Sequence, residues 1–326
     1  MSPQVLSIDK QVDEKQVRIS LDNHFHRYSA EWFTIQQLWL SNAYNAYKDH
    51  DKYLILYYLA KKVLNFYSEY HRILNWDQFF NLKSLVVGKI SINVISRDLN
   101  ISRETTRRKI SELIKDGVIH KKDNKIIIDA QQKIFIKSKE IVKRISLFLH
   151  KYAEGLYKDK IIKESIDVSV IQKVILKNYS YAWKLWFDIQ IPFILERKTI
   201  FKDVESFHIW ATCIQNQNYE VQKFVKKNSL ILENYTDFLH LHTTVRDRTG
   251  INAMSISAIS GIPRATVIRK IKYLLKKKML YIDKNKLYHP DVNFLTSNII
   301  TKLFQNTFLD ICKFTTRIIN LTFTSN

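Results

Sequence analysis

The sequence predicts a mainly α-helical protein with two small β-hairpins, formed by tandem duplication of one module. The main observation is a repeat, ISRDLNISRETTRRKI at residues 95–110 and ISAISGIPRATVIRKI at residues 256–271. At this offset of 161 residues, 12 of the 32 positions in 95–126 are identical to their counterparts. The offset is close to half of the 326-residue chain. A repeat at one fixed offset indicates duplicated domains.

Each copy begins with a short helix followed by a tight turn. Ser91 and Asn252 occupy equivalent positions, and both residue types are good N-caps. Asn100 and Gly261 also coincide, and both tolerate the left-handed backbone that a tight turn between two helices commonly needs. We therefore expect a first helix after each N-cap, a turn, and a second helix two residues after the turn.

The second helix of each copy should have one buried and one basic face. Its core-facing residues recur at i, i+4, i+7 and i+8, which is the spacing of a buried helical stripe. They are Thr106, Ile110, Leu113 and Ile114 in the first copy and Val267, Ile271, Leu274 and Leu275 in the second. An apolar pair, a charged turn and a second apolar segment follow, which predicts a β-hairpin. The helix pairs span about 91–115 and 252–276, and the hairpins about 118–128 and 279–289.

Helix, turn, basic helix and hairpin is the order of a winged helix. Residues 261–269 (GIPRATVIR) closely resemble the second helix of winged helix-turn-helix transcription regulators of the MarR and GntR kind, which often reads Gly-Ile-(Ser/Pro)-Arg-x-Thr-Val-x-Arg. Residues 100–108 (NISRETTRR) match less well, with Asn for Gly and Thr for Val. The resemblance covers about 40 residues in each half. It implies two winged helices that bind duplex DNA.

Aromatic-rich segments with helical spacing precede each repeat, at residues 32–67 and 183–214, and an apolar periodic segment follows each hairpin, at 134–152 and 294–319. We expect two domains, residues 1–160 and 161–326. In MarR-like regulators, helices that flank the winged helix form the dimer interface. The resemblance therefore implies a mainly α fold with small β-wings, in which two tandem winged-helix domains pack as a single-chain pseudo-dimer.

The charge indicates a polyanionic partner. The formal net charge is +21 and the pI is about 9.7. Lys and Arg outnumber Asp and Glu by 28 to 18 in residues 1–160 and by 24 to 13 in residues 161–326. Neutralising phosphates and releasing counterions drives DNA binding by such surfaces. A general abundance of lysine is the alternative explanation, but basic residues cluster on both second helices.

The residue pattern offers no catalytic, cofactor or metal site. The five glycines are far apart, so no phosphate-cradling loop is expected. Cys213 and Cys312 are isolated from each other and from any histidine cluster. The pairs His24/His26 and His240/His242 have a spacing that can bind a metal on a strand, but without further ligands they are expected to be surface or partly buried side chains. We expect neither an enzyme nor a cofactor.

The chain is expected to be soluble and cytoplasmic, associated with the nucleoid. Its first twenty residues are polar and charged, unlike a secretory signal. No run of eighteen apolar residues occurs, so no membrane partner is expected.

Candidate DNA contacts lie on the second helices and hairpins. Arg103 and Arg264 share one position and are the best candidates for bidentate contact with guanine. The full set of base-reading candidates is Arg103, Glu104, Arg107, Arg108, Arg264, Arg269 and Lys272. The phosphate-binding candidates are Ser102, Thr105, Lys109, Lys121, Lys122, Lys125, Thr266, Lys270, Lys284 and Lys286.

Three functions fit this pattern. The leading one is a sequence-specific regulator that binds double-stranded DNA at an asymmetric, two-part site and acts on the transcription machinery. A plasmid or phage replication initiator with tandem winged helices fits as well, and would recruit the replication machinery instead. A winged-helix structural or protein-interaction component is the third, although its second helix need not be basic. A small-molecule effector is a secondary expectation, because helical aromatic stripes more often form core.

Overall fold

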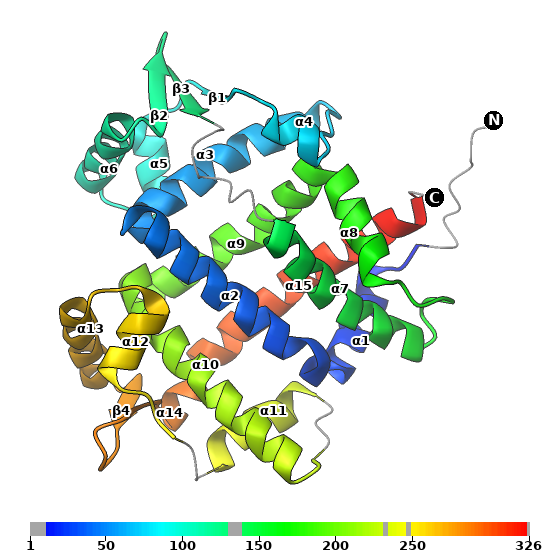
Figure 1. Ribbon diagram of the computed structural model, residues 1–326, viewed down its shortest axis with the longest axis vertical. Coiled ribbons are helices and arrows are strands. Elements are labelled where there is room, and N and C mark those ends of the chain that lie inside the picture. Colours follow the sequence, from blue (N-terminus) through cyan, green and yellow to red (C-terminus); the bar gives the residue numbers. More distant parts are fainter. Residues whose placement is uncertain (1–10, 130–138, 231–233, 246–248, 325–326) are drawn as a thin grey trace.

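The computed structural model describes residues 11–129, 139–230, 234–245 and 249–324, and these are mainly helical with two small antiparallel sheets (Figure 1). The helices of the first half are α1 (Glu14–Asn23), α2 (Phe25–Tyr47), α3 (His50–Glu69), α4 (Trp76–Phe80), α5 (Ile92–Asp98), α6 (Arg103–Lys115) and α7 (Lys139–Lys158). Those of the second half are α8 (Val168–Lys177), α9 (Tyr179–Phe201), α10 (Val204–Lys227), α11 (Tyr235–Thr244), α12 (Ala253–Ser260), α13 (Arg264–Lys276), α14 (Val292–Leu295) and α15 (Asn298–Thr324). The strands are β1 (Ser84–Gly88), β2 (Ile119–Lys122), β3 (Lys125–Asp129), β4 (Leu280–Ile282) and β5 (Tyr288–Pro290).

The helices before each repeat are themselves repeated, at an offset of 154 residues rather than 161. Helices α1 and α8 have 10 residues each, and α2 and α9 have 23 each. Lys48 and Lys202 end α2 and α9 with positive φ angles of 52° and 76°. Asp49 and Asp203 then cap α3 and α10 through their side chains. The duplication therefore includes the flanking helices.

The two halves meet through equivalent residues. Gln36 of α2 and Gln190 of α9 exchange two side-chain hydrogen bonds, of 3.0 and 2.9 Å. Trp32 and Trp186 lie at the same offset, and their rings meet edge to face with centroids 6.1 Å apart. A contact in which a residue meets its own counterpart is typical of an isologous, dimer-like interface. The sequence itself indicates that these segments correspond, since Trp-Phe-x-Ile-Gln occurs at both 32–36 and 186–190.

One core runs through both halves. Helix α3 packs on α9, α2 packs on α10, and α7 and α15 pack on α2 and α9, respectively. Most of the buried apolar side chains between Val12 and Ile319 form a single cluster that includes residues of both halves. The expected division at residue 160 falls between α7 and α8, but the core does not stop there. Part of the expected segment 134–152 lies outside the described residues; α7 begins at Lys139.

Both repeats fold into two short helices and an antiparallel hairpin. The hairpin of the first copy is β2–β3, which β1 extends to a three-stranded sheet in the order β1-β3-β2. In the second copy β4 pairs with β5, and an isolated bridge joins Ile251 to Tyr288 on the other side. The predicted turns are confirmed, because Asn100 and Gly261 have φ angles of 48° and 72°. The second helices begin one residue after Ser102 and Pro263, which are their N-caps.

The local packing of the two copies is the same. Ser96 Oγ donates a 2.6 Å hydrogen bond to the Ile101 carbonyl, and Ser257 Oγ donates one of 2.7 Å to the Ile262 carbonyl. Residues 101–116 and 262–277 follow the same order of buried, half-buried and exposed positions. The spacing of the apolar residues therefore predicted the orientation of both second helices.

Acid should weaken the contact between α3 and α10. Burial alone would raise the pKa of the Glu205 carboxyl, but a 3.2 Å hydrogen bond from His50 Nδ1 and the charges of His50 and Lys270 lower it to about 2. A lowered pKa adds stability above the unfolded pKa, and this is lost as the pH falls from about 4.5 to 2. We expect a loss of about 3 kcal/mol. Glu205→Gln should flatten this part of a plot of unfolding free energy against pH; an unchanged plot would contradict the assignment.

Candidate nucleic-acid interface

The second helices α6 and α13 lie at the same side of the molecule (Figure 1). Helix α6 packs on α3, and α13 packs on α10. Buried residues face that support, namely Thr106, Ile110 and Leu113 on α6 and Val267, Ile271 and Leu274 on α13. The core thus holds both helices with their polar faces outward.

The exposed faces carry most of the predicted base-reading residues. Arg103 and Arg264 are exposed at the first position of α6 and α13, and neither side chain forms a hydrogen bond or ion pair with another residue of the described chain. Arg269 and Lys272 are exposed as well. Such guanidinium and ammonium groups are available to an external anion.

The other base-reading candidates on α6 form ion pairs along the helix. Arg107 lies 3.0 Å from Glu104, and both side chains are exposed. Arg108 Nε lies 3.8 Å from Glu112, which also pairs with Lys52 of α3 at 3.0 Å. Exposed pairs of this kind contribute little to stability, so a stronger external partner can replace them.

Lys109 and Lys270 require a correction, because the structure does not leave them facing solvent. Each of these equivalent lysines pairs with the aspartate that caps the supporting helix, Lys109 with Asp49 and Lys270 with Asp203. Their side chains are mostly covered. They join each second helix to its support, so we no longer assign them to phosphate. The Lys-Asp pairs at 48–49 and 202–203 were the sequence signal for these partners.

The hydroxyl candidates lie at the helix N-termini. Ser102 Oγ accepts a 3.1 Å hydrogen bond from the Thr105 amide and donates one of 2.8 Å to Thr105 Oγ1. Thr266 is half-buried at the equivalent position. Ser102 therefore caps α6, and the site near it also contains the free amides of a helix N-terminus, which favour phosphate.

The hairpin turns present exposed lysines. Lys121, Lys122 and Lys125 surround the β2–β3 turn, where Asp123 and Asn124 have positive φ angles of 50° and 59°. Lys284 and Lys286 are exposed on the β4–β5 turn. Asp283 closes this second turn by accepting hydrogen bonds from the amides of residues 285 and 287. These lysines project from the two hairpin turns.

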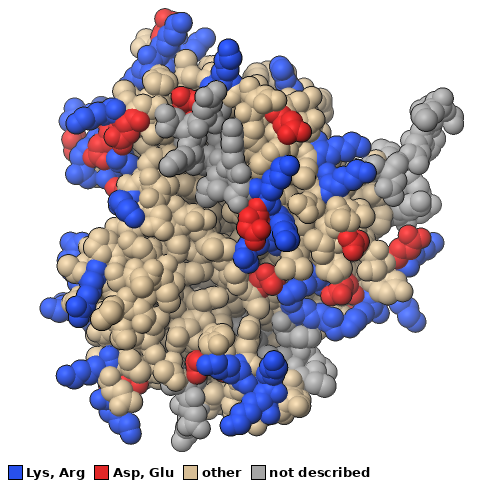
Figure 2. All heavy atoms as spheres, viewed as in Figure 1, with Lys and Arg blue, Asp and Glu red and all other residues tan. Residues whose placement is uncertain are grey.

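Basic side chains mark both ends of this side of the molecule. Figure 2 shows Lys and Arg over the region of α6 and β2–β3 and again over the region of α13 and β4. Acidic side chains are interspersed at α6 and are sparse at α13. Lys and Arg also lie elsewhere on this face, but each of the two units has a basic group at its outer side (Figure 2).

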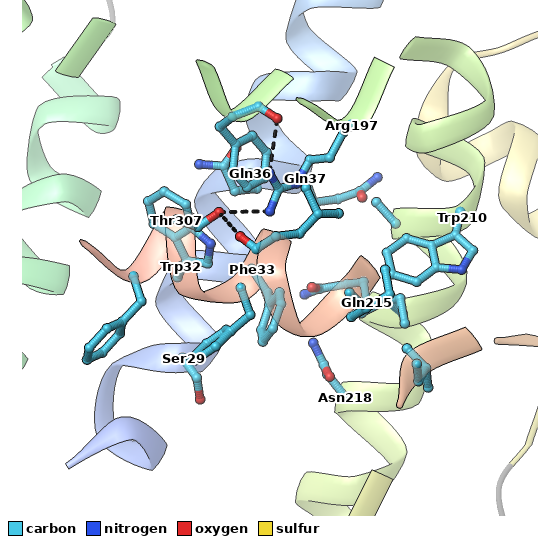
Figure 3. A pocket seen from close by; sticks show the side chains of 18 of the residues that line it. Ser29, Trp32, Phe33, Gln36, Gln37, Arg197, Trp210, Gln215, Asn218 and Thr307 are labelled. Atoms are coloured by element: carbon cyan, nitrogen blue, oxygen red, sulfur yellow. Dashed lines mark hydrogen bonds between the residues drawn. The ribbon is translucent and has the colours of Figure 1, made fainter. Parts of the chain in front are cut away.

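A cavity of about 160 Å³ lies between α2, α9, α10 and α15 (Figure 3). Aromatic rings form a large part of its wall, including Trp32, Phe193 and Trp210. Arg197 is buried beside it and donates hydrogen bonds of 3.0 Å to the Phe193 carbonyl and 2.9 Å to Thr307 Oγ1. Burial lowers the pKa of the guanidinium to about 9. A cavity of this size accommodates about one aromatic ring.

Only the second half has these polar groups in its core. Arg197 and Asn218 correspond, at the offset of 154, to Ala43 and Leu64 of the first half. Asn218 is 4% exposed, and neither Oδ1 nor Nδ2 has a hydrogen-bond partner within the described structure. Burying an unpaired polar group costs free energy. This part of the core has therefore diverged from its counterpart at the expense of stability.

Asn218→Leu should stabilise the protein. The variant restores the residue found at the equivalent position and removes two buried polar atoms without partners. We expect a gain of about 1–3 kcal/mol in the free energy of unfolding, measured by denaturant titration. Leu64→Asn, at the equivalent site of α3, is the matched control and should destabilise. A destabilised Asn218→Leu would show that the amide has a partner inside the protein.

No family model, curated protein or solved structure matches this chain. Across the described segments, no three or more His, Cys, Asp and Glu side chains come together as metal ligands would. Nor does any described helix combine the length and the apolar character needed to cross a membrane. The assignment of function therefore depends on the geometry of α6, α13 and their hairpins.

Proposed function

We propose that this protein is a transcription regulator that binds double-stranded DNA sequence-specifically through two winged helices in one chain. The observation that carries the proposal is the repeated unit of two helices and a hairpin, whose second helix is exposed and basic in both copies. Both units stand on one continuous core and face the same side of the molecule (Figure 1). The proposal assigns no catalytic step and no cofactor to the chain.

The order of elements supports the winged-helix interpretation. Strand β1, helices α5 and α6, and the hairpin β2–β3 follow one another, and β1 pairs with β3. In the second copy, Ile251 pairs with Tyr288 of β5, and this bridge corresponds to the pairing of β1 with β3 in the first copy. The second helix and the hairpin of such a unit can contact the major groove and the adjacent backbone, respectively.

The reciprocal contacts between the halves support the pseudo-dimer. Gln36 with Gln190 and Trp32 with Trp186 are the contacts that a symmetric dimer makes about its axis. A dimer of this kind presents its reading helices to half-sites about one helical turn of DNA apart. Here the two faces differ, with Glu104 against Ala265 and Arg107 against Ile268. The proposed site is therefore asymmetric.

Selection from a random duplex library at physiological salt tests the proposal. Wild type is compared with Arg103→Ala and Arg264→Ala, which change exposed side chains and should leave folding intact. We expect an enriched two-part motif that loses one part in each variant, at about 1–3 kcal/mol per lost contact. Binding without an enriched motif, which only declines with salt, would overturn the proposal.

Two other roles share this geometry. A replication initiator would bind DNA in the same way and recruit the replication machinery, so repeated sites beside a replication origin would favour it. A structural protein would still bind its protein partner after charge reversal of both basic faces.

If a small effector binds, the cavity beside Arg197 is the place for it, because the guanidinium attracts an anionic group. The proposed location is the nucleoid in the cytoplasm.

A further inference from the structure

Four exposed positions on each second helix share the face opposite the buried residues. They follow the spacing i, i+3, i+4 and i+7, by which a helix in the major groove reaches successive bases. These positions are Glu104, Arg107, Arg108 and Ser111 on α6 and Ala265, Ile268, Arg269 and Lys272 on α13. Only the arginine at the third position is common to both helices.

The first two of these positions differ most in chemistry. On α6 they hold an ion pair, with Arg107 Nη2 3.0 Å from Glu104 Oε1. On α13 the same positions hold two apolar side chains, Ala265 and Ile268, and Ile268 is 37% exposed. Residues three apart are neighbours on a helix, so each pair forms one continuous patch.

The surroundings of the apolar pair restrict what can cover it. Arg264, Arg269 and Lys272 lie on the same exposed side of α13. A partner must therefore supply negative charge around an apolar spot. In the major groove, phosphates lie at the edges, and the apolar group presented by the bases is the C5 methyl of thymine. Guanine and cytosine offer acceptors and a donor, which suit Arg107 and Glu104 on α6.

We propose that Ala265 and Ile268 read thymine methyl groups in the second half-site, whereas Glu104 and Arg107 read a G·C step in the first. The inference rests on the proposed function and specifies the base class that each helix recognises. It makes the asymmetry of the site a direct consequence of two positions that diverged after duplication.

Replacing thymine by deoxyuridine tests this, because the exchange removes the methyl group and leaves the hydrogen-bonding groups unchanged. Starting from the selected duplex, deoxyuridine is introduced into one half-site at a time and the affinity of the wild-type protein is measured. In the half-site that loses enrichment with Arg264→Ala, we expect about fourfold weaker binding for each methyl group contacted. Substitution in the other half-site should have no effect.

Two double variants, in which each second helix receives the residue pair of the other, provide a matched test. Ala265→Glu combined with Ile268→Arg copies the α6 pair onto α13, and should abolish the deoxyuridine effect and change the second half-site to G·C. Glu104→Ala combined with Arg107→Ile is the reciprocal exchange and should create the effect in the first half-site. All four side chains are exposed, so circular dichroism should show unchanged folding.

The two proposals fail in different ways. A two-part motif without thymine in the second half-site, or binding that deoxyuridine leaves unchanged, would overturn this inference while the DNA-binding function stands. An absence of any enriched motif would overturn the function itself. Unimpaired DNA selection combined with loss of a protein partner in Ile268→Arg would assign the apolar pair to that partner instead.

Discussion

Replacing Lys121, Lys122, Lys125, Lys284 and Lys286 together by alanine is expected to reduce the salt dependence of DNA binding. All five side chains are exposed on the two hairpin turns. Each phosphate contact contributes about 0.9 to the slope of log affinity against log salt concentration, so five contacts contribute about 4.5. Fluorescence anisotropy between about 50 and 200 mM salt measures this slope.

The enriched sequence should stay the same in this variant, since phosphate contacts position the protein and base contacts specify the site. The matched control also replaces five exposed lysines, which lie on α7 and α8 rather than on either hairpin: Lys139, Lys143, Lys158, Lys173 and Lys177. That control should keep the wild-type slope. An equal loss of slope in the control would mean that positive charge acts on DNA through the whole surface.

Trp186→Ala is expected to destabilise the entire protein by about 3–5 kcal/mol. The Trp186 side chain is fully buried, meets Trp32 across the junction of the two halves and contacts the ring of Phe314 on α15. Small proteins are stable by about 5–15 kcal/mol in total, so the loss is a large fraction. Urea denaturation followed by circular dichroism measures it.

The transition should remain single and shift as a whole, because the core runs through both halves. Tyr70→Ala is the control, since this side chain is 69% exposed and its removal should change stability little. A biphasic transition of which only one phase shifts would mean that residues 1–160 and 161–326 unfold as separate domains.

The sequence alone was sufficient for the local structure of both repeats. The spacing of Ile110 and Leu113, the N-cap Ser91 and the turn residue Asn100 predicted helices and a turn that the structure contains. The hairpins at 118–128 and 279–289 also agree with the observed strands. These features depend on backbone preferences and hydrogen bonds within a few residues, which neighbouring side chains determine.

The helix pattern did not predict the partners of Lys109 and Lys270, because both partners lie outside the helices that carry these lysines. On a helical projection both lysines belong to the polar face, and the nearby carboxylate on α6, Glu112, lies 3.7 Å from the Lys109 ammonium. Asp49 and Asp203 are 60 and 67 residues away, and the fold brings each to its lysine. An ammonium group at the border of a buried face pairs with whichever charge packs against it, which only the tertiary structure determines.

The repeat of the supporting helices shows a second reason why part of the fold was not predicted from the sequence. Four identical residues in the five of 32–36 and 186–190 were present in the sequence, yet the offset of 154 differs from the 161 of the second helices. A search at one offset therefore misses them. Their meaning becomes evident in the structure, where Gln36 and Gln190 bond to each other.

By itself the sequence determined the secondary structure of the repeats, the basic character of α6 and α13 and the presence of the repeat at an offset of 161 residues. The tertiary structure decided which cations are free, how the halves join and that the second half alone carries Arg197 and Asn218 beside a cavity. The physical reason is the separation in sequence over which each kind of interaction acts. Helix periodicity and capping act over a few residues, whereas burial and ion pairing depend on segments that lie 60 to 154 residues apart in the chain.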